Sequence, residues 1–201
     1  MKKIMFNDRY GLTAAVLQGR KTMTRRICKE YATHQPILAR DVESFRFYPD
    51  ENIVEFLMKD GTTKVSVPPY KNNEFVAVAQ AYKDTGLFDI YRGPEDTKGW
   101  NNKMFVRADL MTHFGQITDI NIERLQDISD EDCLKEGIII KTVGDFGTYA
   151  GYGYGERRAS SLDETFSTPR KAFASLIDRI SGKGTWQSNP IVVAYSFRLI
   201  K

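Results

Sequence analysis

The sequence contains few of the residues from which metal sites and disulfide frameworks are built. It has two cysteines, Cys28 and Cys133, and two histidines, His34 and His113. The cysteines lie far apart, and neither is spaced with a histidine as zinc ligands are. We therefore expect no metal, no cofactor and no disulfide, and a reduced, cytoplasmic setting.

Long apolar runs are also missing. The longest fully apolar stretch is "IVVAY" at 191–195, which is far too short to span a membrane. The first residues, "MKKIMFNDRYG", carry charge but no apolar segment of the signal-peptide kind. With 201 residues, 41% of them hydrophobic and 27% charged, the chain is expected to fold as one globular domain without a membrane partner.

Positive charge is concentrated near the start of the sequence. Residues 1–30 contain eight basic and two acidic side chains, although the whole chain carries a formal net charge of only +3. A concentrated basic segment favours an anionic partner, most commonly a nucleic acid. The alternative is a solvated basic end without a ligand.

Capping residues and glycines predict three short helices. They span about 8–18, 129–136 and 168–181, each followed by a glycine that can end it. Ser129 and Asp132 match a capping box at the start of the second helix. The third helix has a capping threonine followed by proline in the first helical position.

Runs of β-branched and aromatic residues predict strands between these helices. The first three, separated by short turns, form a meander. Because strands and helices do not alternate, we expect a mixed α+β fold around a twisted or barrel-like sheet, as one domain over 1–201 with long insertions at about 83–102 and 141–167. The predicted strands are 44–48, 53–58, 63–67, 74–82, 103–111, 117–125 and 191–200.

The insertion at 141–167 is rich in glycine and aromatic residues. Its aromatic and basic side chains could stack on bases, pack the loop onto its own domain, or form an interface with another protein. These three interpretations stay open on the sequence alone. The residues concerned are Phe146, Tyr149, Tyr152, Tyr154, Arg157 and Arg158.

Several segments, taken in order, resemble ASCH-domain proteins of the PUA-like superfamily, above all their phage and prophage branch. They are "VLQGRKTMTRR", "VPPYKNNEFVAV", "ITDINIERLQDISDEDCLKEGI" and "FASLIDRISGKGTWQSNPIVVAYSF". The resemblance covers nearly the whole chain outside the two insertions. It implies a small β-barrel with short helices at its rim, and a cleft that binds RNA or a nucleoside.

The resemblance also implies an activity. In the ASCH branch of N4-acetylcytidine amidohydrolases, a lysine and a threonine of the "GRKTxT" run act together with a glutamate on a short helix. These positions correspond to Lys21, Thr24 and Glu136 in this sequence. We therefore expect the protein to bind RNA or a modified nucleoside. If it is an enzyme, the expected reaction is hydrolysis of an N-acyl amide on a pyrimidine nucleoside.

Elementary chemistry sets conditions on that activity. Threonine is a weak nucleophile unless a base takes its proton, and lysine is a base only if its pKa is lowered by burial or by nearby positive charge. Glu136 would face the negative end of its helix dipole, which suits a proton donor. Because strand side chains alternate, Lys21 and Thr24 can cooperate only if 21–24 is not a regular strand.

Further residues are candidates for holding the ligand. Basic side chains of the first segment can bind phosphate, and aromatic or amide side chains can line the cleft. Two alternatives remain: a module that binds without turnover, and a phage-type accessory protein that binds a host protein through the aromatic loop at 146–154. The candidate binding residues are Arg20, Arg25, Arg26, Tyr82, Trp186 and Asn189.

Overall fold

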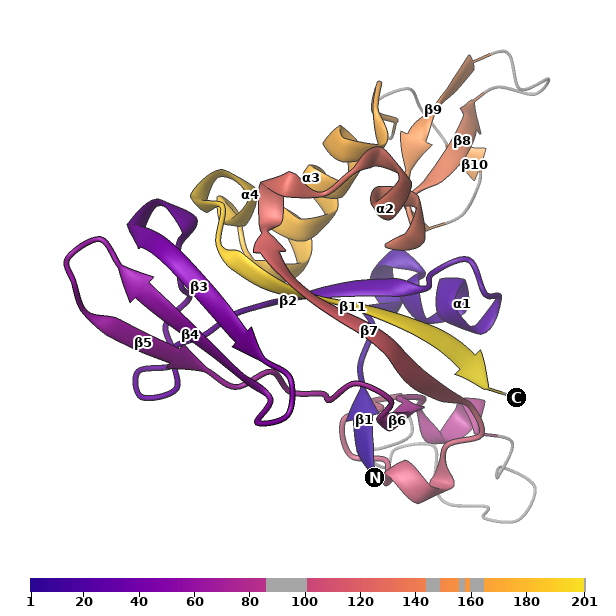
Figure 1. Ribbon diagram of the computed structural model, residues 1–201. Helices are drawn as coiled ribbons and strands as arrows, with labels where there is room; N and C mark the ends of the chain where they lie inside the picture. Colours follow the sequence, from indigo (N-terminus) through magenta and orange to yellow (C-terminus); the bar gives the residue numbers. More distant parts are fainter. Residues whose placement is uncertain (86–100, 144–148, 156–157, 160–164, 201) are drawn as a thin grey trace.

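The protein has a mixed α+β fold, as predicted, made of three β-sheets and a few short helices (Figure 1). The computed structural model describes residues 1–85, 101–143, 149–155, 158–159 and 165–200. The meander lies on one side of the central strands. The helices α2 (Asp130–Lys135) and α3 (Pro169–Ser181) lie on another side, together with the sheet formed by β8, β9 and β10 (Figure 1).

The central sheet has five strands in the order β1-β6-β7-β11-β2. β2 is one edge of this sheet. Its neighbour β11 pairs antiparallel with β2 on one side and with the long β7 on the other. Residues 191–195 are buried without alternation, as expected of a strand covered on both faces. The bounds are β1 Lys2–Ile4, β2 Met23–Ile27, β6 Phe75–Val78, β7 Phe114–Arg124 and β11 Ile191–Ile200.

The predicted closed barrel is wrong for the part of the chain that the structure describes. A barrel requires every strand to be paired on both sides, yet no backbone pairing joins the edge strands β1 and β2 within the described ranges. A side chain connects them instead: Nη2 of Arg26 in β2 donates to the carbonyl of Met5, just after β1, at 2.6 Å. The central sheet therefore stays open between its two edges.

The predicted meander is confirmed as a separate three-stranded antiparallel sheet, comprising β3 (Val42–Tyr48), β4 (Ile53–Met58) and β5 (Thr63–Ser66). Its β4 alternates in burial, so that one face joins the main hydrophobic core and the other meets solvent.

The third sheet, with order β10-β8-β9, lies mostly in the region predicted as a long connection. It consists of β8 (Ile139–Val143), β9 (Tyr149–Gly153) and β10 (Arg158–Ala159).

The strand predicted over 103–111 is wrong. The segment forms turns and the 3₁₀ helix η5 (Ala108–Leu110), because its carbonyls at 103, 104 and 106 accept hydrogen bonds from the ammonium of Lys3 rather than from a neighbouring strand.

The second and third predicted helices are confirmed, and the first is split by Gly11 at φ 66°. Ser129 caps α2 and Thr168 caps α3, each through its side-chain oxygen. No helix of the described ranges is long and apolar enough to cross a bilayer. The helices are η1 Asp8–Tyr10, α1 Leu12–Leu17, η2 Ala39–Asp41, η3 Tyr82–Asp84, η5, η6 Leu125–Asp127, α2 Asp130–Lys135, α3 Pro169–Ser181 and α4 Thr185–Ser188.

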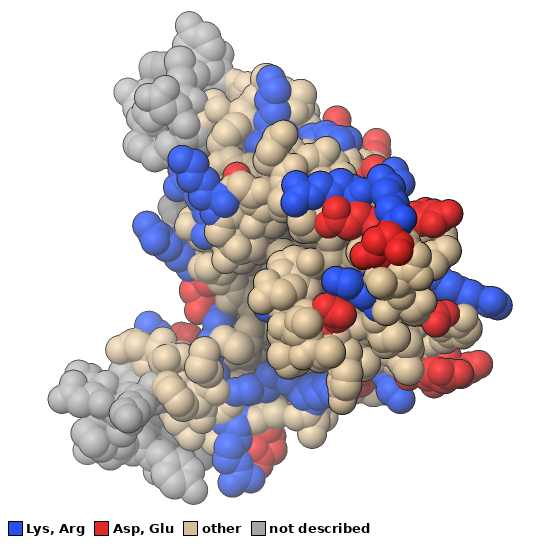
Figure 2. Space-filling model, turned by 90° about the vertical axis from the view of Figure 1, so that its left-hand side faces the viewer, with Lys and Arg blue, Asp and Glu red and all other residues tan. Residues whose placement is uncertain are grey.

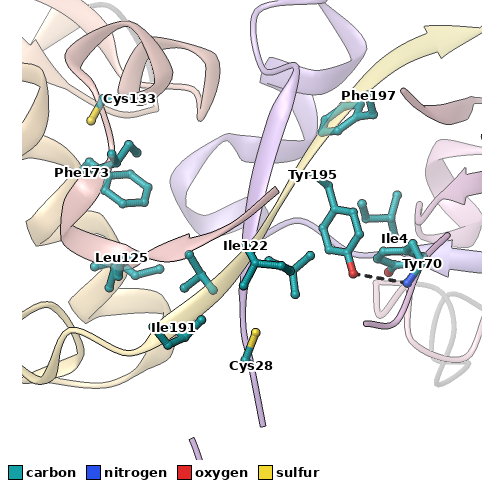
Figure 3. Close-up of a cluster of buried hydrophobic side chains, with 14 of the residues drawn as sticks. Ile4, Cys28, Tyr70, Ile122, Leu125, Cys133, Phe173, Ile191, Tyr195 and Phe197 are labelled. Atoms are coloured by element: carbon teal, nitrogen blue, oxygen red, sulfur yellow. Dashed lines mark hydrogen bonds between the residues drawn. The ribbon is translucent and has the colours of Figure 1, made fainter. Parts of the chain in front are cut away.

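The main core joins the central sheet, the meander and α3. Figure 3 shows the part in which side chains of the central strands lie near Phe173 of α3. At the centre of the core the ring of Tyr195 packs edge-on against that of Tyr70, with 5.3 Å between centroids, and its hydroxyl accepts the Tyr70 backbone N–H at 3.4 Å. Both cysteines are buried there, and this burial raises the pKa of each thiol to about 12.

We expect Phe56→Ala to lower the free energy of unfolding by about 3–5 kcal/mol, because it empties a core site. The Phe56 side chain is 0% exposed, whereas the next residue, Leu57, is 39% exposed on the opposite face of β4. Leu57→Ala is the matched control and should cost less than about 1 kcal/mol. Urea denaturation measures both, and equal losses would contradict the packing of β4 described above.

Candidate cleft at the open edge of the sheet

A cleft of about 650 Å³ lies between the open edge of the central sheet, the residues that follow β1, and α3. Five predicted site residues line it, four from residues 21–26 and one from the end of α2. They are Lys21, Thr24, Arg25, Arg26 and Glu136.

The backbone before β2 brings Lys21 and Thr24 to the same cleft. After α1 the chain turns at Gly19, at φ 72°, and the backbone N–H of Lys21 donates to the carbonyl of Ala15 at 3.0 Å. Residues 21–22 are irregular, as predicted, whereas residues 23–24 already belong to β2, contrary to prediction. Thr24 lies opposite Tyr195 in a regular antiparallel ladder.

Glu136 reaches the cleft as the last residue before α2 is broken. It forms the C-cap of α2, and Gly137 follows at φ 101°. A Cβ atom at Gly137 would lie 3.5 Å from the Lys21 side chain, and this backbone conformation strongly favours glycine. Because 3.5 Å is an ordinary van der Waals contact, the positive φ and not the space beside Lys21 is what requires glycine at the end of the helix.

Lys21 and Glu136 form a buried ion pair. The Lys21 Nζ lies 2.5 Å from Oε2 of Glu136 and donates to the Glu136 carbonyl at 2.7 Å, while the residues are only 2% and 4% exposed. Burial lowers the pKa of Lys21, and the nearby Arg26 and Arg25 lower it further, whereas Glu136 opposes the shift. Lys21 thus has the direction of pKa shift that a catalytic base requires.

Arg25 holds the acidic side of this site together. Its side chain is 1% exposed, and its three nitrogens donate to three carboxylates. Nε lies 2.7 Å from Glu123, Nη2 lies 3.0 Å from Asp132, and Nη1 lies 3.2 Å from Glu136. Burial lowers the pKa of Arg25, but the carboxylates outweigh this effect and raise it. These contacts give Arg25 a positioning role for Glu136.

The carboxylate of Asp132 belongs to this ion network and does not complete the predicted capping box. Its backbone N–H does donate to the Ser129 hydroxyl, but its carboxylate bonds Arg25 and Lys135, the latter at 2.9 Å. Partial burial raises the pKa of Asp132, and the bonds from Lys135 and Arg25 outweigh that effect and lower it. The cap and the ion network therefore share one residue.

Thr24 is 5% exposed, and within the described part of the chain its hydroxyl has no hydrogen-bond partner. The Lys21 ammonium uses two of its three donors on Glu136, and it lies 5.7 Å from the centroid of the Phe6 ring. The lining of the cleft thus contains a hydroxyl without a partner among the described residues and a partly engaged amine, and the two are not hydrogen-bonded to each other.

Four predicted binding residues do not line the cleft, so that prediction is not supported for them. Arg20 donates twice to Gln18, and Tyr82 packs on a small separate cluster with Val106. Trp186 packs edge-on against Phe173, with 6.2 Å between centroids, whereas Asn189 accepts the backbone N–H of Gln126 at 2.9 Å. Trp186 and Asn189 fasten the α4 turn to the core.

The apolar wall of the cleft was not predicted as part of the site. α3 contributes Phe173, Leu176, Ile177 and Ile180 to the lining. The first three of these side chains also belong to the main core. One feature of the sequence could have indicated this role: the apolar stripe of α3 continues to Ile180, one turn beyond its last buried residue. Ile180 remains 38% exposed.

The described tyrosines of the aromatic loop pack onto their own domain. The Tyr154 ring meets that of Tyr10 edge-on with 5.5 Å between centroids, and its hydroxyl lies 3.3 Å from Oγ of Ser175. Tyr152 packs against the main core. Phe146, Arg157 and the side chains of Tyr149 and Arg158 lie outside the described residues.

Charge on the adjacent side of the molecule is mixed. Figure 2 shows basic and acidic side chains interleaved over the face that carries the meander, rather than a single broad basic patch. Among the described residues, no three histidine, cysteine or acidic side chains come together in a way that could hold a metal ion.

No family model, no curated protein and no solved structure matches this chain.

We expect Arg25→Met to lower the free energy of unfolding by about 3–5 kcal/mol, because it leaves three clustered carboxylates without their shared cation. Arg107→Met is the matched control, since Arg107 pairs with Asp109 on the open surface. It should not change stability measurably. Urea denaturation at neutral pH compares the two, and a neutral Arg25→Met would show that the network is not what holds Glu136.

Proposed function

We propose that this protein hydrolyses the N-acyl amide of an acylated pyrimidine nucleoside, in the manner of the ASCH-domain amidohydrolases that its motifs resemble. Lys21 is the base, Thr24 the nucleophile and Glu136 the proton donor. The observation that carries the proposal is their arrangement: a buried amine of lowered pKa, a hydroxyl that has no hydrogen-bond partner among the described residues, and a buried carboxylate line one cleft.

The Lys21–Glu136 contact can prepare both catalytic groups in one step. Transfer of a proton from Nζ of Lys21 to Oε2 of Glu136, along the 2.5 Å contact, yields a neutral amine and a neutral acid. The amine can then accept the proton of the Thr24 hydroxyl as its oxygen attacks the amide carbon. The acid donates its proton to the leaving nitrogen as the C–N bond breaks.

Water completes the cycle. The Lys21 proton first passes again to Glu136, so that the neutral Lys21 amine takes a proton from water as the water attacks the acyl-threonine ester. Glu136 gives its proton to the leaving Thr24 oxygen, which restores the hydroxyl, releases the carboxylic acid and returns both groups to their starting state. Arg25 keeps one oxygen of Glu136 in place at 3.2 Å while the other oxygen exchanges its proton. In this proposal the two carboxylate oxygens therefore have separate tasks.

The size and lining of the cleft suit a nucleoside. A volume of about 650 Å³ falls within the range of small-molecule sites, about 300–1,000 Å³. The apolar side chains of α3 can cover the flat face of a pyrimidine, while the polar groups lie on the β2 side. We also propose that the chain is related to the ASCH domains. The four motifs quoted above support this relationship, although the central sheet is open and not closed into a barrel.

The first test is hydrolysis of a panel of N4-acylated cytidines, followed by chromatography. Lys21→Met should reduce kcat/KM by about 10²–10⁴-fold, because it removes general-base catalysis. This variant should still fold, since it removes a buried cation while Arg25 continues to pair with Glu136.

Two threonines allow a matched comparison. Thr24→Val removes the proposed nucleophile and should abolish turnover, whereas Thr24→Ser keeps a hydroxyl and should retain much of it. Thr22→Val is the control, because Thr22 lies two residues earlier and outside the cleft lining. Full activity in Thr24→Val would refute the mechanism, and no turnover of any panel member by the wild type would favour a binding module.

The pH profile gives a separate prediction. The proposed mechanism needs one proton on the Lys21–Glu136 pair, so log kcat/KM should fall at high pH, where that proton is lost. Since burial lowers the pKa of Lys21 from its ordinary value of 10.5, the fall should begin below 10.5. Above that point Lys21 is neutral but Glu136 has no proton to donate. Arg26→Gln removes a nearby positive charge and should move the inflection upward. An inflection at or above the ordinary lysine value would exclude Lys21 as the base.

A further inference from the structure

A second cleft, of about 520 Å³, adjoins the first. Both are lined by the same four residues of β2 and its surroundings, namely Met5, Arg26, Ile27 and Lys29. The second cleft continues from this shared wall toward the end of the meander, where Tyr31, Ser66 and Tyr70 line it. A ligand too long for the first cleft can therefore extend into the second without leaving the surface.

The shared wall carries two cations without a carboxylate partner among the described residues. Lys29 is exposed and has no ion pair there, and Arg26 bonds only the carbonyl of Met5. An arginine has five N–H donors, so most of the Arg26 guanidinium stays available. These two side chains can bind an anion without breaking any ion pair in the described structure.

The other charged residues of the second cleft are already engaged. The Lys3 ammonium donates to three backbone carbonyls, at 2.6, 2.9 and 3.3 Å. Glu30 lies 3.4 Å from the ammonium of Lys64 and accepts the Thr33 hydroxyl at 2.5 Å. The available charge is therefore positive and lies at the junction of the two clefts.

An aromatic side chain is exposed beyond that junction. Tyr31 is 69% exposed, although its backbone N–H is tied to the carbonyl of Val65 at 2.7 Å. Its backbone is thus held while its ring remains open to solvent. Exposed rings beside a basic groove are the platforms on which the bases of single strands stack.

We propose that the ligand is a single-stranded nucleic acid whose acylated pyrimidine enters the first cleft. Its adjoining phosphate binds between Arg26 and Lys29, and the next base stacks on Tyr31 in the second cleft. This inference rests on the proposed function, because it assumes that a pyrimidine nucleoside occupies the first cleft. It changes the substrate class from a free nucleoside to a nucleotide within a strand.

The test is direct binding of products that cannot be turned over: cytidine, cytidine 5′-monophosphate and a cytidine ribotrinucleotide, measured by calorimetry at fixed salt. Affinity should rise about tenfold or more from the nucleoside to the trinucleotide, the gain expected of one charge-assisted contact and one stacked base. Trinucleotide binding should also weaken as salt increases.

Three variants separate the contacts. Lys29→Gln should weaken trinucleotide binding about tenfold and lower its log–log salt slope by about 0.7, the value for one phosphate contact on a single strand. Tyr31→Ala should weaken only the trinucleotide, by about tenfold. Lys59→Gln is the matched control, since Lys59 is exposed and lines neither cleft, and it should change nothing.

Three results would overturn the proposal. One is equal affinity for nucleoside and trinucleotide. Another is a gain for the monophosphate with no further gain for the trinucleotide, which would indicate a free nucleotide. The third is an equal loss of nucleoside binding in Lys29→Gln. Hydrolysis of N4-acylated cytidine is measured separately. Turnover without any rise in affinity from the nucleoside to the phosphate-containing ligands refutes only the proposal of a single-stranded ligand. A rise in affinity that depends on Lys29, without turnover, refutes only the proposal of hydrolysis.

Discussion

The buried contact between Lys21 and Glu136, held in place by Arg25, is the interaction on which the rest of the site depends. It joins the turn before β2 to the end of α2, two segments more than a hundred residues apart in sequence. Buried ion pairs are poor sources of stability, because desolvation of the charges offsets their attraction. Well-packed apolar groups can often replace such a pair at no cost in stability, so stability alone does not account for it. In the proposed mechanism, one proton shift along this short contact produces a base and an acid together.

The open edge of the central sheet gives this chemistry its access. In a closed barrel the space between β1 and β2 would be occupied by backbone hydrogen bonds. Here Arg26 spans that space with a single side-chain bond to Met5, and the first cleft lies beside it. The same arginine also lines the second cleft. The departure from a barrel is therefore what allows two clefts to meet at one basic wall.

Local signals account for the parts of the fold that sequence analysis predicted correctly. The caps at Ser129 and Thr168 and the meander of β3–β5 depend on residues close together in the chain. The errors have long-range causes. The strand predicted over 103–111 is absent because Lys3, about a hundred residues away, takes up its carbonyls. β1 is three residues long and gains its pairing only from the distant β6, so no local pattern identifies it.

By itself the sequence determined the helix ends, the strand-rich α+β class and the choice of Lys21, Thr24 and Glu136 as candidates, because caps, periodicity and motifs are properties of neighbouring residues. Only the tertiary structure decided what each candidate touches. Arg25 was expected to bind phosphate, and it bonds carboxylates from β7 and α2 instead. Tyr82, Trp186 and Asn189 were expected in the cleft and lie elsewhere. The physical reason is that burial and ion pairing depend on side chains brought together from distant segments, and no local pattern of residues contains that geometry.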